Sequence, residues 1–311
     1  MKTFFRGSGF VGALLVALSA VPAQAQSLYR AYLSSTGSDA QDCSYASPCR
    51  TFAVAINQTR PKGTIVCRDT IADNAIVGIS KSLTIACPGS SIASIVVHPA
   101  AADVVVLSGL IINPGAVAGP ALNINTAGTV IVDKAHIGSG IQTGINLNPT
   151  GPAKLIVNDS VIAGNGNGDA AGAGILVKPQ PGGSAQVAIE RVNVSGNLFG
   201  IAFDGSGSTG GINATIADSV LASNKQDGVV ATTSSGHAPI GVMLRATRSA
   251  NNAYGIRSIG PNVTVRVEGS TVTGNGTGLA ASGGGALLSL GGNAVQANGA
   301  KGAFTGSLAL E

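Results

Sequence analysis

The chain has 311 residues with a formal net charge of +4, and only 10% of its residues are charged and 4% aromatic. Tryptophan is absent, and the 18 lysine and arginine residues are scattered along the chain. Binding of nucleic acid needs clustered cations and stacking aromatic side chains, so we expect no nucleic-acid partner.

The first 25 residues have the pattern of a secretory signal peptide. Lys2 and Arg6 form a basic start, residues 10–20 are apolar, and residues 23–25 (A-Q-A) form a small-x-small cleavage site. The apolar run is shorter than the roughly 20 residues of a transmembrane helix, and no later segment predicts a membrane span. We therefore expect cleavage after Ala25 and a secreted or periplasmic protein, whose remaining charge is too small to indicate a membrane partner.

All four cysteines lie in the first third of the chain, at Cys43, Cys49, Cys67 and Cys87. An even number of cysteines in an exported chain favours two disulfide bonds. Of the three possible pairings we favour Cys43–Cys49 with Cys67–Cys87, because the second pair lies near the ends of two β-rich segments about one coil apart. A zinc site is the alternative, but no C-x-x-C pair and no nearby histidine supports it.

Residues 26–63 are interpreted as an N-terminal cap. Residues 29–33 (Y-R-A-Y-L) predict a short strand, and Ser47 before Pro48 favours the start of a helix over about residues 48–60. Phe52, Ala55 and Ile56 give this helix an apolar face, and residues 61–63 (P-K-G) end it. We expect the helix to cover the unpaired strand edges at one end of a stack.

Residues 64–311 are interpreted as a stack of strands, because one pattern recurs about every 26 residues. Residues 155–165 read L-I-V-N-D-S-V-I-A-G-N, and residues 214–224 read A-T-I-A-D-S-V-L-A-S-N. This spacing is typical of one coil of a solenoid, whose coils are stable only when stacked. After each turn comes a glycine followed by an aliphatic residue; such a glycine suits positive φ or a place where backbones crowd.

Two aliphatic columns appear when the repeats are aligned on their turns, and both are expected to face the core. The column eight residues before the turn consists of Val105, Val132, Val157, Ile189, Ile216, Leu244, Val267 and Leu290. The column three residues before the turn consists of Leu110, Ile137, Ile162, Val194, Leu221, Val272 and Val295, with Ser249 as its exception.

Asparagine recurs at the turn itself and predicts a structural ladder, in which each side-chain amide bonds the coils above and below. Its use as a sugar or calcium ligand is the alternative, but asparagine also tolerates the left-handed conformation of a bend. The predicted ladder is Asn113, Asn165, Asn197, Asn224, Asn252, Asn275 and Asn298, with Gly140 at the corresponding turn of the second coil.

The repeat resembles that of the pectin lyase-like right-handed parallel β-helix superfamily, over residues 64–311. Residues 47–59 resemble its N-terminal capping helix, and the chain is most similar to small exported bacterial members with a cysteine-bearing cap. The resemblance implies an all-β, right-handed parallel β-helix solenoid of about nine to ten coils with a short capping helix.

Members with known chemistry act on acidic polysaccharides, with clustered aspartates for calcium and a basic residue, or with N-x-D, D-D, G-H-G and R-x-K motifs. This chain has no D-D pair; His237 lies in a G-H-A sequence within a polar loop, and Arg60-Pro61-Lys62 ends the predicted helix. No family site carries over onto these residues.

Charged residues before the turns alternate in sign from coil to coil, at Lys134, Asp159, Arg191 and Asp218. Adjacent opposite charges favour a neutralised outer face rather than a site. The weak catalytic candidates are Asp133, His136, Asp159 and Arg191, where a histidine would act beside carboxylates.

The sequence favours an exported β-helix scaffold without catalytic activity, which presents a surface to a carbohydrate, a cell-envelope component or a protein. The alternative is a polysaccharide lyase or hydrolase acting on an acidic glycan. Calcium is expected only under that alternative, and otherwise no cofactor is expected. The apolar residues 304–311 carry no capping helix and predict self-association through the C-terminal coil.

Overall fold

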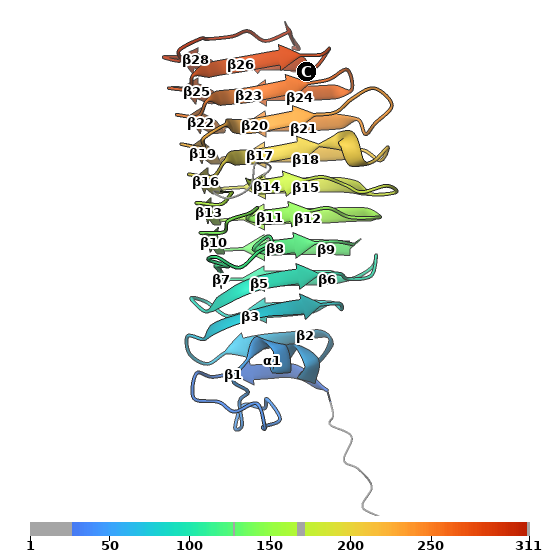
Figure 1. Cartoon of the computed structure of the whole chain (residues 1–311), viewed down its shortest axis with the longest axis vertical. Coiled ribbons are helices and arrows are strands. Elements are labelled where there is room, and N and C mark those ends of the chain that lie inside the picture. Colours follow the sequence, from blue (N-terminus) through green and yellow to red (C-terminus); the bar gives the residue numbers. More distant parts are fainter. Residues whose placement is uncertain (1–26, 127, 167–171, 310–311) are drawn as a thin grey trace, which may run out of the picture.

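The computed structural model describes residues 27–126, 128–166 and 172–309, so the predicted signal peptide lies outside the described residues. The strands stack in one column from the N-terminal to the C-terminal end, and the single α-helix of the described residues, α1 (Phe52–Gln58), lies at the N-terminal end of the column (Figure 1). A search of these ranges finds no helix that is long and apolar enough to cross a membrane.

Each regular coil has one long strand, one short strand and a third strand, and the long strands pair in parallel into a 12-stranded sheet that we call the long sheet. The long strands are β1 (Leu28–Leu33), β2 (Thr59–Cys67), β4 (Leu83–Ala86), β6 (Val104–Ser108), β9 (Gly128–Asp133), β12 (Pro152–Asn158), β15 (Ser184–Glu190), β18 (Ile212–Ala217), β21 (Ile240–Arg245), β24 (Val263–Glu268), β27 (Ala286–Gly291) and β29 (Gly306–Ser307).

The remaining strands form a parallel 17-stranded sheet that covers the other faces of the column. Its short strands are β7 (Ile111–Ile112), β10 (His136–Gly138), β13 (Val161–Ala163), β16 (Asn193–Ser195), β19 (Val220–Ala222), β22 (Arg248–Ala250), β25 (Thr271–Thr273) and β28 (Ala294–Gln296). Its third strands are β8 (Leu122–Ile124), β11 (Ile145–Leu147), β14 (Ala173–Val177), β17 (Phe199–Asp204), β20 (Asp227–Thr232), β23 (Tyr254–Ile259) and β26 (Thr277–Ser282). A short 3-10 helix, η1 (Gly205–Gly207), follows β17.

The number of coils agrees with the repeat. The three-strand coil runs for about eight turns. In the two coils below it, β2 and β4 are each followed by a single longer strand, β3 (Ala72–Ile79) or β5 (Ser91–Val97). The strand β5 pairs with both β7 and β8, so one strand there takes the place of two. The predicted all-β parallel solenoid is confirmed.

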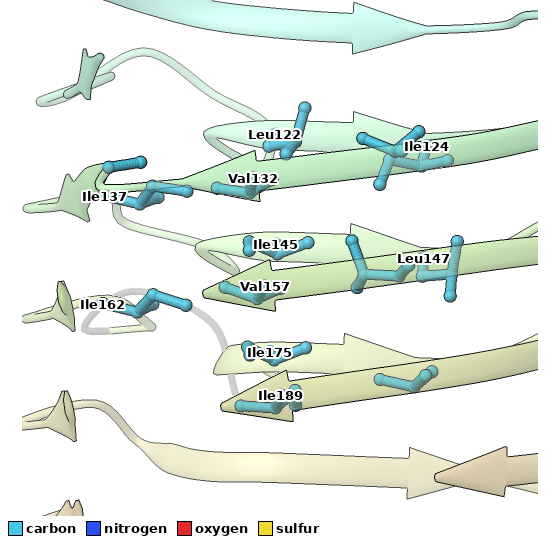
Figure 2. Packing of buried hydrophobic residues seen from close by; sticks show 14 of the residues in the cluster. Leu122, Ile124, Val132, Ile137, Ile145, Leu147, Val157, Ile162, Ile175 and Ile189 are labelled. Carbon is cyan, nitrogen blue, oxygen red and sulfur yellow. The ribbon is translucent and has the colours of Figure 1, made fainter. Parts of the chain in front are cut away.

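Aliphatic columns fill the core. Val132, Val157 and Ile189 lie above one another on adjacent long strands (Figure 2), pair in register and are buried. Ile145 and Ile175 form an equivalent column on the third strands. Because stacked strands lie about 4.8 Å apart, equivalent side chains pack directly on each other, and each coil depends on its neighbours for burial.

The predicted columns are out of register by two residues in the first aligned coil. Leu107 rather than Val105 joins the first column, and Ile112 rather than Leu110 joins the second. All four side chains are fully buried. Residues two apart on a strand share a face, so hydrophobicity alone does not distinguish the two registers.

Two serines replace aliphatic residues in these columns. Ser289 pairs with Val267 in place of the predicted Leu290, because the register shifts by a bulge at the next residue. Ser249 is buried in the second column and donates a hydrogen bond to the carbonyl oxygen of Gly255 at 2.8 Å. The hydroxyl of Ser249 is therefore satisfied inside the core.

The helix starts later than predicted, at Phe52, and Ser47 and Pro48 precede it in a loop. The backbone of Cys49 bonds to β1, donating to Tyr32 O at 3.0 Å and accepting from Ser34 N at 3.0 Å. This pairing holds the segment extended, so a helix cannot begin at Pro48.

The other end of the helix is set by strand pairing as well. Residue Thr59 already belongs to β2, and so does Pro61, which was predicted to lie in the stop signal. At the start, Thr51 makes no side-chain capping bond, and Asp73 accepts the Phe52 N–H at 3.0 Å instead. The buried residues Phe52, Ala55 and Ile56 form the predicted apolar face.

Both favoured disulfide bonds, Cys43–Cys49 and Cys67–Cys87, are present. Cys67 ends β2 and Cys87 directly follows β4, its neighbour in the long sheet, so this bond links adjacent coils. Disulfide bonds are typical of proteins that fold in an oxidising compartment.

Candidate functional site

A buried asparagine ladder runs along one turn of the column. Each side chain donates from Nδ2 to the Oδ1 of the next asparagine at 2.9–3.1 Å, and that Oδ1 also accepts the backbone N–H of the asparagine below. The members are Asn165, Asn197, Asn224, Asn252, Asn275 and Asn298. These amides are bonded within the stack, as in a structural ladder.

Asn113 is not part of the ladder, contrary to prediction. Its side chain is exposed and its Oδ1 accepts the Gly115 N–H at 3.1 Å. In the next coil Gly140 donates its N–H to Asn165 Oδ1 at 3.3 Å but has no side chain to continue the ladder. The ladder therefore begins at Asn165.

A second polar column was missed from the sequence. It lies at the bend between the long and short strands, where hydroxyl oxygens accept backbone N–H groups from the coil below. Ser160 accepts from Ala135 at 3.0 Å, Ser219 from Val192 at 3.1 Å, and Ser270 from Thr247 at 3.1 Å. The signal was the serine that recurs five residues before the turn, which looked like an ordinary turn residue.

The column of alternating charges occupies the same bend. Lys134, Asp159, Arg191 and Asp218 all have positive φ, between 48° and 53°, and all are exposed. Arg191 donates from Nε and Nη2 to Asp159 at 2.7 and 3.0 Å, and the hydrogen bond from Arg191 holds the pKa of Asp159 below its ordinary value. Lys134 and Asp218 form no ion pair with any described residue, so the predicted alternation yields one pair only.

The four weak catalytic candidates lie at the bend and on either side of it. Asp133 ends β9 and accepts from Ser108 Oγ at 3.3 Å, whereas His136 begins β10 beyond the bend and is exposed. Within the described ranges, the ion pair of Arg191 with Asp159 is the only one among the four. No three His, Cys, Asp or Glu side chains of these ranges are grouped to hold a metal ion.

A shallow groove of about 520 Å³ lies on the outer face of the long sheet, across β12, β15, β18, β21 and β24. Its floor consists of outward-facing side chains that pair in register along two rows. Lys154, Gln186, Asn213 and Gly241 form one row, and Ile156, Ala188, Thr215, Met243 and Arg266 form the other. Short side chains at Ala188 and Thr215 in the second row and the absence of a side chain at Gly241 in the first leave the hollow between the longer ones.

The groove continues toward the N-terminal end. A second hollow of about 190 Å³ shares Lys154 and Gln186 with the first and is also lined by Thr129 of β9. The six adjacent strands from β9 to β24 extend for about 24 Å along the column, given their spacing. The groove is thus long, open and parallel to the column axis.

The groove is electropositive. Lys154 and Arg266 are its charged lining residues, and no carboxylate or aromatic ring lines either hollow. Neither cation forms an ion pair with a described residue. The repeat is defined by its turns and does not indicate these outward-facing rows, which become adjacent only through strand register.

Neither a family model nor a curated protein matches the sequence. Among solved structures, pectate lyase Pel9A is similar with a TM-score of 0.51, at 14% identity over 89% of this chain and 79% of that chain. The chain is a right-handed parallel β-helix. The Dettilon tailspike protein is also similar, with a TM-score of 0.49 at 14% identity. The match covers 78% of this chain and 56% of the tailspike.

One carboxylate of the β-helix is fully buried, away from the groove. Asp227 begins β20 and pairs with Arg257 of β23, whose guanidinium carbon lies 4.4 Å from the centre of the Tyr254 ring. Burial raises the pKa of Asp227 to about 6, although Arg257 opposes the shift. In the folded protein this carboxyl therefore keeps its proton to a higher pH than in the unfolded chain.

Asp227 should make the β-helix less stable as the pH rises from about 4 to about 6, because the folded state holds the extra proton in that range. We expect the unfolding free energy of the parent, minus that of Asp227→Asn, to fall by about 1–3 kcal/mol across this range. Urea denaturation at several pH values measures it. Asp218→Asn is the control, because it makes the same substitution at an exposed position; the same profile in both variants would contradict the assignment to Asp227.

Proposed function

We propose that this chain is an exported, non-catalytic β-helix that binds an extended anionic glycan along the groove of the long sheet. The two disulfide bonds and the N-terminal pattern of residues 1–25 support export. The observation that carries the ligand class is the uncompensated positive charge of Lys154 and Arg266 in a long open groove.

The lining chemistry supports a glycan. Between the cations lie the amides of Gln186 and Asn213 and the hydroxyl of Thr215, all exposed on the outer face. Amides and hydroxyls both donate and accept hydrogen bonds, as sugar hydroxyls do. Anionic groups of the glycan would contact the two cations, which lie on β12 and β24 at opposite ends of the larger hollow.

The same lining supports binding without cleavage. Hydrolysis of a glycan uses a pair of carboxyl groups, and calcium needs several oxygen ligands of which some are carboxylates. The residues that line the two hollows supply no carboxylate.

The proposal is tested by calorimetric titration with oligogalacturonate of defined length and with neutral dextran. The parent should bind the anionic oligomer only. Lys154→Gln/Arg266→Gln should weaken binding at least about tenfold, because each charge-assisted hydrogen bond contributes about 1.5–3 kcal/mol.

Lys134→Gln/Arg245→Gln is the matched control. It removes one lysine and one arginine from exposed positions at the bend, outside both hollows. Binding should stay within about threefold of the parent. An equal loss in both variants would mean that only net charge matters, and release of unsaturated or reducing-end products by the purified parent would show an enzyme.

A further inference from the structure

The N-terminal cap carries two exposed tyrosine–arginine pairs, Tyr29 with Arg60 at the start of β2 and Tyr45 with Arg68 just beyond its end, which together we call the Tyr–Arg face. Tyr29 is 56% and Tyr45 63% exposed, which makes them the most exposed aromatic side chains of the described residues. The guanidinium carbons of Arg60 and Arg68 lie 4.6 Å from the ring centres of Tyr29 and Tyr45 respectively. Each arginine is thus stacked on an exposed tyrosine.

The Tyr45–Arg68 half of the face is held in place by several contacts. Tyr45 lies in the loop that the Cys43–Cys49 disulfide closes, and the Tyr32 ring meets its ring edge-on at 5.2 Å between centres. Arg68 also donates from Nη1 to the carbonyl oxygen of Tyr45 at 3.0 Å. Side chains already held in place lose little conformational entropy when a partner binds.

Neither Arg60 nor Arg68 forms an ion pair with a carboxylate of the described part of the chain. The nearby acidic side chains are occupied by the cap's own backbone. Asp39 accepts the N–H groups of Arg50 and Thr51, both at 2.9 Å, and Asp69 accepts that of Ser35 at 2.6 Å. A guanidinium stacked on a ring keeps N–H groups at its edge that a carboxylate can accept. Arg68 donates from Nη1 to the carbonyl oxygen of Tyr45, and its remaining N–H groups suit the same kind of acceptor.

We propose that the Tyr–Arg face is a docking surface for an acidic segment of a protein partner. Tyrosine and arginine are among the residues that most often dominate protein–protein binding energy, and guanidinium groups that form no ion pair favour carboxylates. A sugar chain would need a concave site, and the two hollows of the groove are lined by other residues. The face lies on β1, β2 and their loops, beyond β4 and β6 from the groove, so it is a separate site.

The first test uses a fluorescently labelled oligoglutamate peptide as the probe and oligolysine as its control, at low salt. The parent should bind oligoglutamate saturably. Arg60→Gln/Arg68→Gln should weaken binding at least about tenfold, whereas the equally charged groove variant Lys154→Gln/Arg266→Gln should change it less than about threefold. Arg60→Lys/Arg68→Lys should also weaken it, because lysine lacks the planar fork.

The proposal would be overturned if the parent showed no saturable binding of oligoglutamate, or if the face and groove variants lost that binding equally. It would also be overturned if the face variant kept peptide binding but lost binding to oligogalacturonate or to phosphatidylglycerol vesicles. The last would show a glycan or a membrane as the partner. A measurement on the unchanged protein guards against misfolded variants: oligoglutamate should shift the amide resonances of Tyr45 and Arg68 in a nitrogen-15 NMR titration, and their failure to move would equally contradict docking.

Discussion

Replacing Asn224 with alanine is expected to lower the free energy of unfolding by about 2–4 kcal/mol. Asn224 Oδ1 accepts both the backbone and the side-chain N–H of Asn197, and its Nδ2 donates to Val194 O and Asn252 Oδ1. The substitution leaves the buried backbone N–H of Asn197 without its acceptor and removes one hydrogen bond each from the side chains of Asn197 and Asn252. An unpaired buried group is more costly than a lost surface bond.

Chemical denaturation followed by circular dichroism measures the effect of Asn224→Ala. The matched control is Asn193→Ala, which removes an exposed asparagine from β16 in the coil below and should cost little. Equal stabilities of Asn224→Ala and the parent would show that the ladder is not a source of stability.

Replacing Gly200 with alanine is expected to cost about 3 kcal/mol through overpacking. A Cβ at this position would lie 2.9 Å from Asn224 Nδ2 and would also meet the carbonyl oxygen of Gly228. Both are parts of the packed stack, so neither is free to move aside. The φ angle of Gly200 is not positive, so the requirement for glycine comes from space alone.

Gly78→Ala is the control for this substitution, because Gly78 is an exposed strand glycine with an ordinary φ. A Cβ there would have only His98 Nε2 nearby, at 3.5 Å. Alanine should leave stability unchanged or raise it by a few tenths of a kcal/mol, since it restricts the unfolded chain. Thermal melts that rank Gly78→Ala below Gly200→Ala would contradict the crowding argument.

The glycine column shows how much the sequence could predict and where it stopped. The repeat placed a glycine after each turn and left two explanations, positive φ or crowding. A Cβ added at Gly174, Gly200 or Gly255 would lie only 2.9–3.0 Å from the Nδ2 of a ladder asparagine, so crowding is the reason for glycine. The sequence reveals that the glycine and the asparagine recur together. Only the coordinates show that the asparagine amide occupies the space where a side chain of the glycine position would lie.

Errors of prediction arose where tertiary pairing overrode a local signal. Ser47 and Pro48 have the right types for a helix start, but the backbone pairing of Cys49 with β1 holds them extended. Asn113 fits the turn pattern, but Val105 and Leu107 are both apolar and lie two positions apart in its coil. The pattern therefore allows two strand registers and does not select the observed one. The groove was not predicted for a related reason, because Lys154 and Arg266 lie in different coils and share no sequence motif.

The asparagine ladder makes the coil a unit of insertion. Asn224 bonds only to groups of its own and the adjacent coils. An added coil with its own asparagine, crowding glycine and left-handed bend residue would therefore form again each hydrogen bond that its insertion breaks. One such coil between β12 and β24 would move the two groove cations apart by about 4.8 Å. Duplication of a coil could therefore change the length of ligand that the groove accepts in fixed steps, with no existing residue altered.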